Sequence, residues 1–288
     1  MTTYDLHQHL WPESFLERLA ARTTPPSLEA GVLTTVEGRF SVDLGEHRLE
    51  SRLAALDRDG IDVAVISLQT SLGFEHLSME ERASLEEAWA EGARELVDAA
   101  GGRIRAFSPS RIRDGFVGVS IGSAVLAGLG DSESILQEAE TVGALVFVHP
   151  DAGRAAGASR PDWWDWVTGY PARMQEAYLA WLAFGRERWP SLQVVFAMLA
   201  GGGPFQLERL ARRGIDVRSA LDPNTFFDVS THGRRAIELC IETFGVSQLV
   251  YGSDTPVVDP EPTLAAVRGF GDAVTHVLQT DTPERLLA

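Results

Sequence analysis

Two histidines near the start of the chain, His7 and His9, stand two residues apart in the segment YDLHQHL. In a β-strand the side chains at i and i+2 leave the same face, so these imidazoles can converge on one point. Such a pair is common by chance, and taken alone a structural role is its simpler interpretation. Its position, where an apolar run meets a loop, favours a metal site.

Two further apolar runs end in a residue that can bind a metal: LVFVH ends in His149, and LVYGSD ends in Asp254. In a closed eight-stranded barrel, strands 1 and 8 are neighbours and strand 5 lies across the mouth. The four side chains of His7, His9, His149 and Asp254 can then surround one divalent cation. Three nitrogens and a carboxylate suit zinc first, with manganese, iron or cobalt as alternatives. Asp254 would be a base for a proton of metal-bound water, whose pKa such an ion lowers.

The elements that must position these residues are short apolar runs that alternate with longer segments of helical period. This pattern is typical of strand–helix units around a parallel sheet. Eight units in 288 residues predict an α/β fold, a (β/α)8 TIM barrel that forms one domain over residues 1–288, with a doubly wound open sheet as the competitor. The expected strands are residues 4–9, 61–68, 104–108, 116–121, 144–149, 193–198, 225–230 and 248–254.

Residues 23–47 interrupt the strand–helix pattern. The segment LTTVEGRFSVDLG alternates polar and apolar residues around Glu37 and Gly38. This alternation predicts a small hairpin, inserted into the barrel after strand 1.

Composition excludes several classes of function. The 41 Asp+Glu outnumber the 25 Lys+Arg, and the net charge of −16 argues against binding to nucleic acid or membrane surfaces. Every basic residue is Arg, so Schiff-base, P-loop and carbamylated lysines are excluded. One cysteine, Cys240, and an N-terminus without secretory features favour a cytoplasmic protein. A homodimer is the default quaternary state.

An ordered set of segments resembles the amidohydrolase superfamily, in the branch related to 2-amino-3-carboxymuconate semialdehyde decarboxylase. The set covers nearly the whole chain: YDLHQHL, RLESRLAALDRDGIDVAVIS, FVGVSIG, VFVHP, VVFAMLAGGGPFQLERL, FFDVST and YGSDTP. The resemblance implies a mononuclear metal-dependent barrel with His7, His9, His149 and Asp254 as ligands. It also implies a hydrolase or a nonoxidative decarboxylase. We expect hydrolysis of a small organic amide, lactone or related acid first, and decarboxylation of a small carboxylic acid second.

One position departs from the family. At the end of strand 6, where the family usually has a histidine that assists water activation, this chain has Met198. Methionine can neither donate a proton nor stabilise an oxyanion. A third hypothesis is therefore a catalytically altered barrel, or one that binds a small molecule without turnover. His232, in STHG after strand 7, is a candidate to approach the same space and act in catalysis.

Candidate substrate-binding residues come from the expected rim loops. Trp11 and Trp163 offer aromatic faces to a planar substrate, Arg154 offers a guanidinium to a carboxylate, and Met198 would face the same pocket. Local packing is an equal alternative for the tryptophans. Three further histidines, His47, His76 and His276, receive no role.

A different chemistry is suggested by GVSIG, which matches the G-x-S-x-G nucleophile elbow around Ser120, with Asp254 and His276 following in the chain order of a hydrolase triad. An elbow needs a helix that begins at the serine. The sequence after Ser120 is apolar and glycine-rich, so we favour the metal site.

Overall fold

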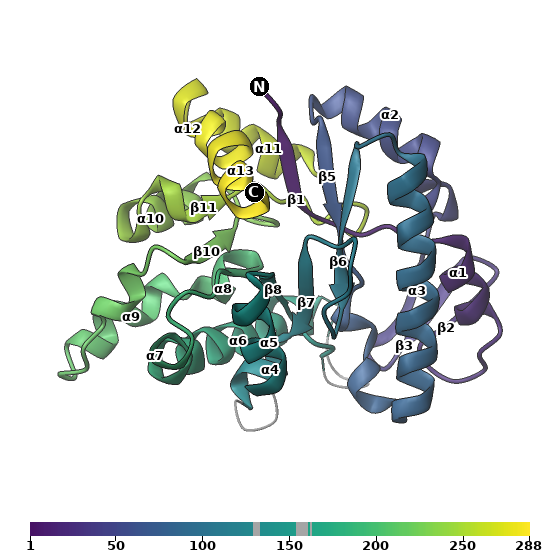
Figure 1. Cartoon of the computed structure of the whole chain (residues 1–288), viewed down its shortest axis with the longest axis horizontal. Coiled ribbons are helices and arrows are strands. Elements are labelled where there is room, and N and C mark those ends of the chain that lie inside the picture. The colour runs from purple at the N-terminus through teal and green to yellow at the C-terminus, as the bar shows by residue number, and fades with distance from the viewer. Residues whose placement is uncertain (129–132, 154–160, 162) are drawn as a thin grey trace.

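The protein is described by a computed structural model over residues 1–128, 133–153, 161 and 163–288. Its centre is one eight-stranded sheet in the order β1-β5-β6-β7-β8-β9-β10-β11, in which neighbouring strands are parallel (Figure 1). The strands are β1 (Tyr4–Gln8), β5 (Val63–Ile66), β6 (Ile104–Pro109), β7 (Gly118–Gly122), β8 (Leu145–His149), β9 (Val194–Phe196), β10 (Thr225–Asp228) and β11 (Leu249–Val250). Each of the eight expected strands is present.

Backbone hydrogen bonds close this sheet into a barrel. The N–H of Asp254 donates to the carbonyl oxygen of His7 over 2.8 Å, and the N–H of His9 donates to Thr255 over 2.7 Å. These bonds join β1 to the segment that follows β11, so the first and last strands are neighbours. The structure therefore confirms the (β/α)8 barrel, and the doubly wound open sheet is wrong.

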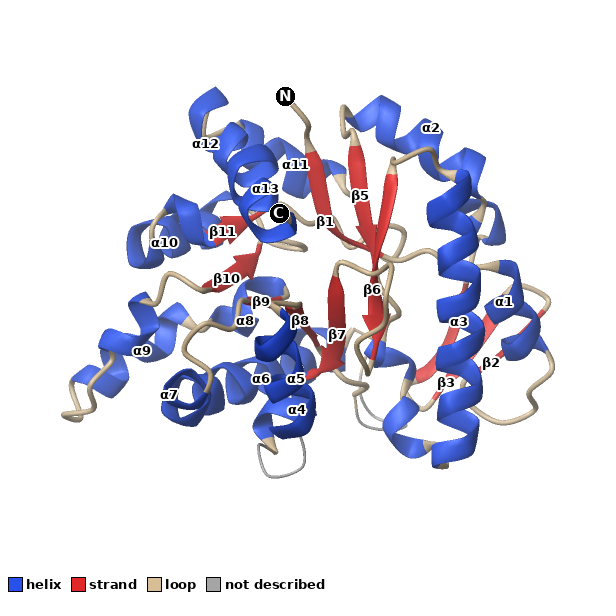
Figure 2. Ribbon diagram, in the orientation of Figure 1, coloured by secondary structure: helices blue, strands red, loops and turns tan. Residues whose placement is uncertain are grey.

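Helices surround the barrel strands, as Figure 2 shows. Every residue of β1, β7 and β8 is buried, as expected for parallel strands that are covered on both faces. The helices are α1 (Glu13–Ala20), α2 (Leu49–Asp59), α3 (Met79–Ala99), α4 (Ser123–Ala127), α5 (Glu133–Val142), α6 (Trp164–Ala180), α7 (Arg186–Arg188), α8 (Met198–Gly202), α9 (Pro204–Ala211), α10 (Arg234–Phe244), α11 (Glu261–Arg268), α12 (Asp272–His276) and α13 (Thr282–Leu287). Local sequence sets some of their ends: Ser78 and Glu81 form a capping box that starts α3.

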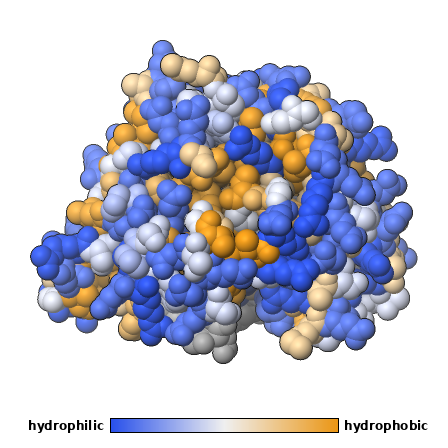
Figure 3. Space-filling view, viewed as in Figure 1, coloured by the Kyte–Doolittle hydropathy of each residue, from blue (hydrophilic) through white to orange (hydrophobic). Residues whose placement is uncertain are grey.

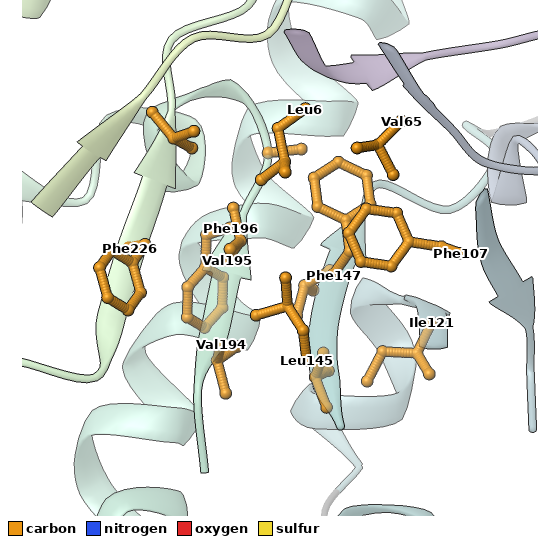
Figure 4. Close-up of a cluster of buried hydrophobic side chains, with 14 of the residues drawn as sticks. Leu6, Val65, Phe107, Ile121, Leu145, Phe147, Val194, Val195, Phe196 and Phe226 are labelled. Atoms are coloured by element: carbon orange, nitrogen blue, oxygen red, sulfur yellow. The ribbon is translucent and has the colours of Figure 1, made fainter. Parts of the chain in front are cut away.

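Buried apolar side chains from different strands meet in the core (Figure 4). Phe107 of β6 stacks on Phe147 of β8 with ring centroids 5.2 Å apart, and the Phe147 ring lies 4.9 Å from the His7 ring. The polar residues at the strand ends therefore rest on an apolar layer that excludes water from one side.

The insertion contains three antiparallel strands: β2 (Ser27–Glu29), β3 (Val32–Thr35) and β4 (Gly38–Ser41). Thr35 pairs with Gly38, which leaves Val36 and Glu37 as the turn between β3 and β4. The expected hairpin around Glu37 and Gly38 is thus present, and β2 extends it to a three-stranded sheet. The insertion follows helix α1 rather than strand β1 directly, and it ends in the 3-10 helix η1 (Leu44–His47).

Among the described residues, no helix has both the length and the apolar character needed to cross a bilayer. On the face shown in Figure 3, hydrophilic side chains surround a smaller group of apolar ones near the middle.

Candidate metal centre

Four polar side chains meet where β1, β8 and β11 end. His7 lies on β1 and His9 just after it, His149 is the last residue of β8, and Asp254 follows β11. Their potential ligand atoms all lie within 4.8 Å of one another. The bond from the Asp254 N–H to the His7 carbonyl explains this proximity, because it brings together residues from the two ends of the chain.

Three nitrogen atoms and one carboxylate oxygen form the group. Nε2 of His7 lies 3.1 Å from Nε2 of His9, and Oδ1 of Asp254 lies 3.1 Å from the His9 nitrogen and 3.5 Å from that of His7. The His149 ring stands nearly perpendicular to both other imidazoles, with centroids 5.2 Å from His7 and 5.1 Å from His9.

The other ring nitrogen of each histidine has an acceptor of its own. Nδ1 of His7 lies 2.6 Å from Oδ2 of Asp228, that of His9 lies 2.9 Å from the Ser67 carbonyl, and that of His149 lies 3.0 Å from the Pro150 carbonyl. These acceptors place the proton on Nδ1, so the lone pairs of all three Nε2 atoms face the common point.

This donor set fits a divalent cation. Facing lone pairs 3.1 Å apart repel each other unless a proton or a cation lies between them. Three neutral imidazoles and a carboxylate are a common ligand set for zinc, manganese or iron. The sequence predicted that these four residues gather, and the structure places them together.

Burial and nearby carboxylates shift the pKa values of the histidines at the metal centre in opposite directions. Burial holds the pKa values of His9 and His149 well below the usual value, so both imidazoles are neutral at pH 7 and able to bind a metal. Burial also opposes the charged form of His7, but the carboxylates of Asp228 and Asp254 outweigh it and raise its pKa to about 9. A cation that binds here must therefore displace a proton from Nε2 of His7, which leaves the three imidazoles neutral. Burial raises the pKa of Asp254.

Sequence reasoning missed Asp228, which orients His7. It is the last residue of β10, and its carboxylate also accepts hydrogen bonds from the hydroxyl and the N–H of Ser230. The segment FFDVS had the same signal as the four ligands, a polar residue at the end of an apolar strand. Asp5, by contrast, is a buried structural carboxylate that accepts from the N–H groups of His7 and Ser253.

A cavity of about 730 Å³ has His149 and Asp254 in its wall. Trp11 lines it, stacks on His47 at 4.5 Å between centroids, and donates from Nε1 to Oε1 of Gln69 over 2.7 Å. His47, to which the sequence assigned no role, therefore lies in the cavity wall and supports Trp11. The insertion, which the sequence linked to no function, supplies much of the remaining wall.

The other predicted substrate-binding residues have different outcomes. Met198 lines the cavity together with Trp11. Trp163 precedes helix α6, is 48% exposed and packs against Trp164. Trp166, in the first turn of α6, lines the cavity. Trp163 is not in the described lining, so its role in substrate binding stays a prediction without support from the cavity. Arg154 lies outside the described residues.

His232 stays a prediction without support from the cavity. Its neighbour Thr231 is in the described lining and His232 is not, and Nδ1 of His232 lies 2.8 Å from the Ser230 carbonyl. A catalytic role for His232 in place of the missing strand-6 histidine therefore stays untested.

Met198 begins an unusual turn. Five consecutive residues from Met198 have positive φ: 54° at Met198, 50° at Leu199, 52° at Ala200, 61° at Gly201 and 86° at Gly202. L-residues with side chains rarely adopt this left-handed region, and each costs roughly 1–2 kcal/mol. The segment labelled α8 is thus a left-handed turn that leads into α9. It places Met198 in the cavity wall.

The nucleophile-elbow alternative is wrong. Ser120 lies in the middle of β7 rather than at a strand-to-helix turn, and α4 begins only at Ser123. His276 belongs to α12 and pairs with Asp281. Neither residue joins Asp254 in a triad.

Comparisons with known proteins agree with this geometry. No protein-family model matches the chain. A curated 2-amino-3-carboxymuconate-6-semialdehyde decarboxylase from Dictyostelium discoideum is 29% identical in an alignment 160 residues long, which covers 49% of this chain and 44% of that protein. The match therefore spans less than half of the relative's length.

Solved structures show the same fold over almost the whole chain. The 5-carboxyvanillate decarboxylase from Sphingomonas paucimobilis has a TM-score of 0.79 and 16% identity, and covers 99% of this chain and 98% of its own. The 5-carboxyvanillate decarboxylase from Novosphingobium aromaticivorans, complexed with manganese and 4-hydroxy-3-methoxy-5-nitrobenzoic acid, has a TM-score of 0.73 and 15% identity, with coverage of 99% and 96%. The sequence and fold comparisons together confirm the resemblance to the amidohydrolase superfamily, in its branch related to 2-amino-3-carboxymuconate semialdehyde decarboxylase.

Proposed function

We propose that this chain is a metal-dependent, nonoxidative decarboxylase of a small carboxylic acid with a planar ring. Hydrolysis was our first expectation from the sequence, and decarboxylation our second. The comparisons reverse this order, because the curated relative and both solved structures are named as decarboxylases.

One observation within the chain carries the same preference. Met198 lies in the wall of the cavity that contains His149 and Asp254, at the position where a histidine was expected. Hydrolysis of an amide or lactone needs a group that moves protons to and from water, and a thioether has no such capacity. Loss of carbon dioxide needs no water as a reactant, so an apolar side chain there does not obstruct it.

His7, His9, His149 and Asp254 would hold one divalent ion, and the manganese in the Novosphingobium structure supports manganese at least as much as zinc. The ion would supply positive charge that binds substrate oxygens and stabilises the negative charge that develops as carbon dioxide leaves.

Side chains of the protein would orient the substrate and supply the proton. Trp11 is held rigid by its stack on His47 and its hydrogen bond to Gln69, so its face can orient a planar ring. As the bond to the carboxylate breaks, its electron pair stays on the ring carbon, which must take up a proton. Asp254 lies at the metal centre and in the cavity wall, so its carboxyl group is placed to deliver that proton. The products are then carbon dioxide and the substrate with hydrogen in place of the carboxylate.

The test is release of carbon dioxide by the metal-loaded protein from a panel of hydroxylated and aminated benzoic acids, run in deuterium oxide. We expect carbon dioxide together with one deuterium at the carbon that lost the carboxylate. Hydrolysis of amides or lactones without carbon dioxide release would contradict the proposal. Metal binding without turnover of the benzoic acids, amides or lactones would favour the third hypothesis, a barrel that binds a small molecule without turnover. The small-molecule substrate is the partner that this proposal needs, and the homodimer stays a prediction.

A further inference from the structure

Glu37 brings a carboxylate from the insertion to the cavity. It occupies the turn between β3 and β4 and is one of the described residues that line the cavity. Oε2 accepts a hydrogen bond of 2.6 Å from the Tyr170 hydroxyl, and Oε1 accepts one from the N–H of Gly153. The tip of the insertion is thus attached to α6 and to the loop after β8.

Both hydrogen-bond partners of Glu37 are neutral donors, so neither of them compensates its charge. No ion pair joins Glu37 to an arginine or histidine of the described chain, and the protein has no lysine. Arg173 of α6 lowers the pKa of Glu37 through space, without an ion pair. A carboxylate has about four acceptor positions, and two of those of Glu37 are in use.

The described wall of the cavity contains other carboxylates and no arginine. Asp43 and Glu46, both exposed, add two more acids from the insertion. A substrate whose carboxylate lies among the four metal-centre residues therefore presents its opposite end to the carboxylates of the described part of the wall. A second carboxylate at that end would be repelled, whereas an amino group would be attracted and would find free acceptor positions.

We propose that Glu37 determines substrate specificity by binding an amino group at the end of the acid remote from the departing carboxylate. This inference rests on the proposed function, because the decarboxylation site fixes which end of the substrate faces the metal centre. It assigns the insertion a role in recognition, and it names the substrate class as amino-substituted carboxylic acids rather than dicarboxylic acids.

Glu37 has an alternative role as a tether that only holds the insertion in place, and the two roles predict different results. A tether affects every ligand equally, since it acts through the shape of the cavity. A specificity residue affects only ligands that carry the amino group. Glu37→Gln separates the roles because glutamine keeps the size and one acceptor oxygen but removes the charge.

The experiment uses three matched 2-hydroxybenzoates that carry aminomethyl, methyl or carboxylate at ring position 4. Their binding to the manganese-loaded protein is measured by calorimetry at pH 8, and carbon dioxide release is measured in parallel. For the wild type we expect the aminomethyl compound to bind at least about tenfold more tightly than the methyl compound, as a charge-assisted hydrogen bond provides. The dicarboxylate should bind most weakly.

Glu37→Gln should weaken binding of the aminomethyl compound about tenfold to a hundredfold and leave the methyl compound unchanged. The matched control is Glu29→Gln, which makes the same chemical change at an exposed position of β2 outside the cavity lining and should change neither affinity. Tyr170→Phe removes the hydroxyl that holds Oε2, so it should reduce the amine preference in part.

Equal affinities of the wild type for the amino and methyl compounds, or equal losses for all three ligands in Glu37→Gln, would overturn the inference. Failure of the proposed function gives a different result. A preference for the amine that depends on Glu37, without any carbon dioxide release, keeps the specificity assignment and rejects decarboxylation. Carbon dioxide release without a preference for the amine keeps the decarboxylase function and rejects the role of Glu37 in specificity.

Discussion

Asp228 lies 2.6 Å from the Nδ1 atom of His7, and 221 residues separate them in the chain. Both side chains are fully buried. Because Asp228 accepts the Nδ1 proton, the lone pair of Nε2 can only point toward His9, His149 and Asp254. A carboxylate outside the ligand set thus decides whether His7 can serve as a ligand.

Replacing Asp228 by asparagine should weaken metal binding about tenfold to a hundredfold, the usual effect of losing such a hydrogen-bond partner. The amide cannot accept from both His7 and Ser230 without turning its NH2 group toward a donor. Competition against a chelator measures the affinity. Asp216→Asn, at an exposed position, should leave the affinity unchanged. Unchanged metal affinity in Asp228→Asn would show that His7 is oriented by packing alone.

The purified protein should contain about one equivalent of a divalent metal per chain, as expected for a single mononuclear site. His149→Ala should remove most of it, because the variant lacks one of three nitrogen ligands. Elemental analysis measures the content, and thermal unfolding with and without manganese measures the coupled stabilisation. His276→Ala, a substitution far from the cavity on α12, is the control and should retain the metal. Full metal content in His149→Ala would rule out the four-residue site.

The barrel and the four residues of the metal centre could be predicted from sequence for a physical reason. Parallel strands covered on both faces are apolar throughout, so a polar residue such as His149 or Asp254 marks the strand end. All such ends meet at one rim of a barrel. Strand order alone then predicts which residues meet at the metal centre, without any knowledge of the loops.

The cavity walls could not be predicted, because they depend on small shifts in loops and helix starts. The described lining includes Trp166 of α6 but not Trp163, which precedes the helix, and nothing in the sequence separates these two tryptophans. The roles of Glu37 and His47 arise only when the insertion folds over the barrel. The left-handed turn at Met198 contradicts the preference of its own residues, so no local rule indicates it.

Arg52 should be a stability determinant of the barrel mouth. Its buried guanidinium donates to Oε1 of Gln8 over 2.8 Å and to the carbonyls of His9 and Glu46 over 3.1 and 3.2 Å. Arg52→Met leaves these buried acceptors without this donor, so the free energy of unfolding should fall by at least about 2 kcal/mol. Denaturant unfolding measures it, with the exposed Arg58→Met of the same helix as control. Equal stabilities of the two variants would contradict this role.

Met198→His should add hydrolytic activity that the wild type lacks. An imidazole in this part of the cavity wall can move protons, a contribution of roughly 10²- to 10⁴-fold in rate. Hydrolysis of a panel of lactones and amides by the metal-loaded proteins measures it. Met198→Leu, which stays apolar, should resemble the wild type. Wild-type lactone hydrolysis as fast as that of Met198→His would mean that the missing histidine does not limit the chemistry, and it would weaken the preference for decarboxylation.

The preference for an amino group should depend on pH through Glu37. Burial raises the pKa of this carboxyl to about 7, helped by Asp165 and Glu75, while the Tyr170 hydroxyl and Arg173 lower it. The neutral acid therefore predominates below pH 7 and the carboxylate above it.

The affinity ratio of the aminomethyl to the methyl 2-hydroxybenzoate should accordingly rise between pH 6 and 8 with a midpoint near the pKa of about 7. In Glu37→Gln the ratio should stay flat over this range, because no charge appears. Calorimetry at a series of pH values with the manganese-loaded protein measures both. A rise of the same size in Glu37→Gln would assign the pH dependence to another group and leave Glu37 as a structural tether.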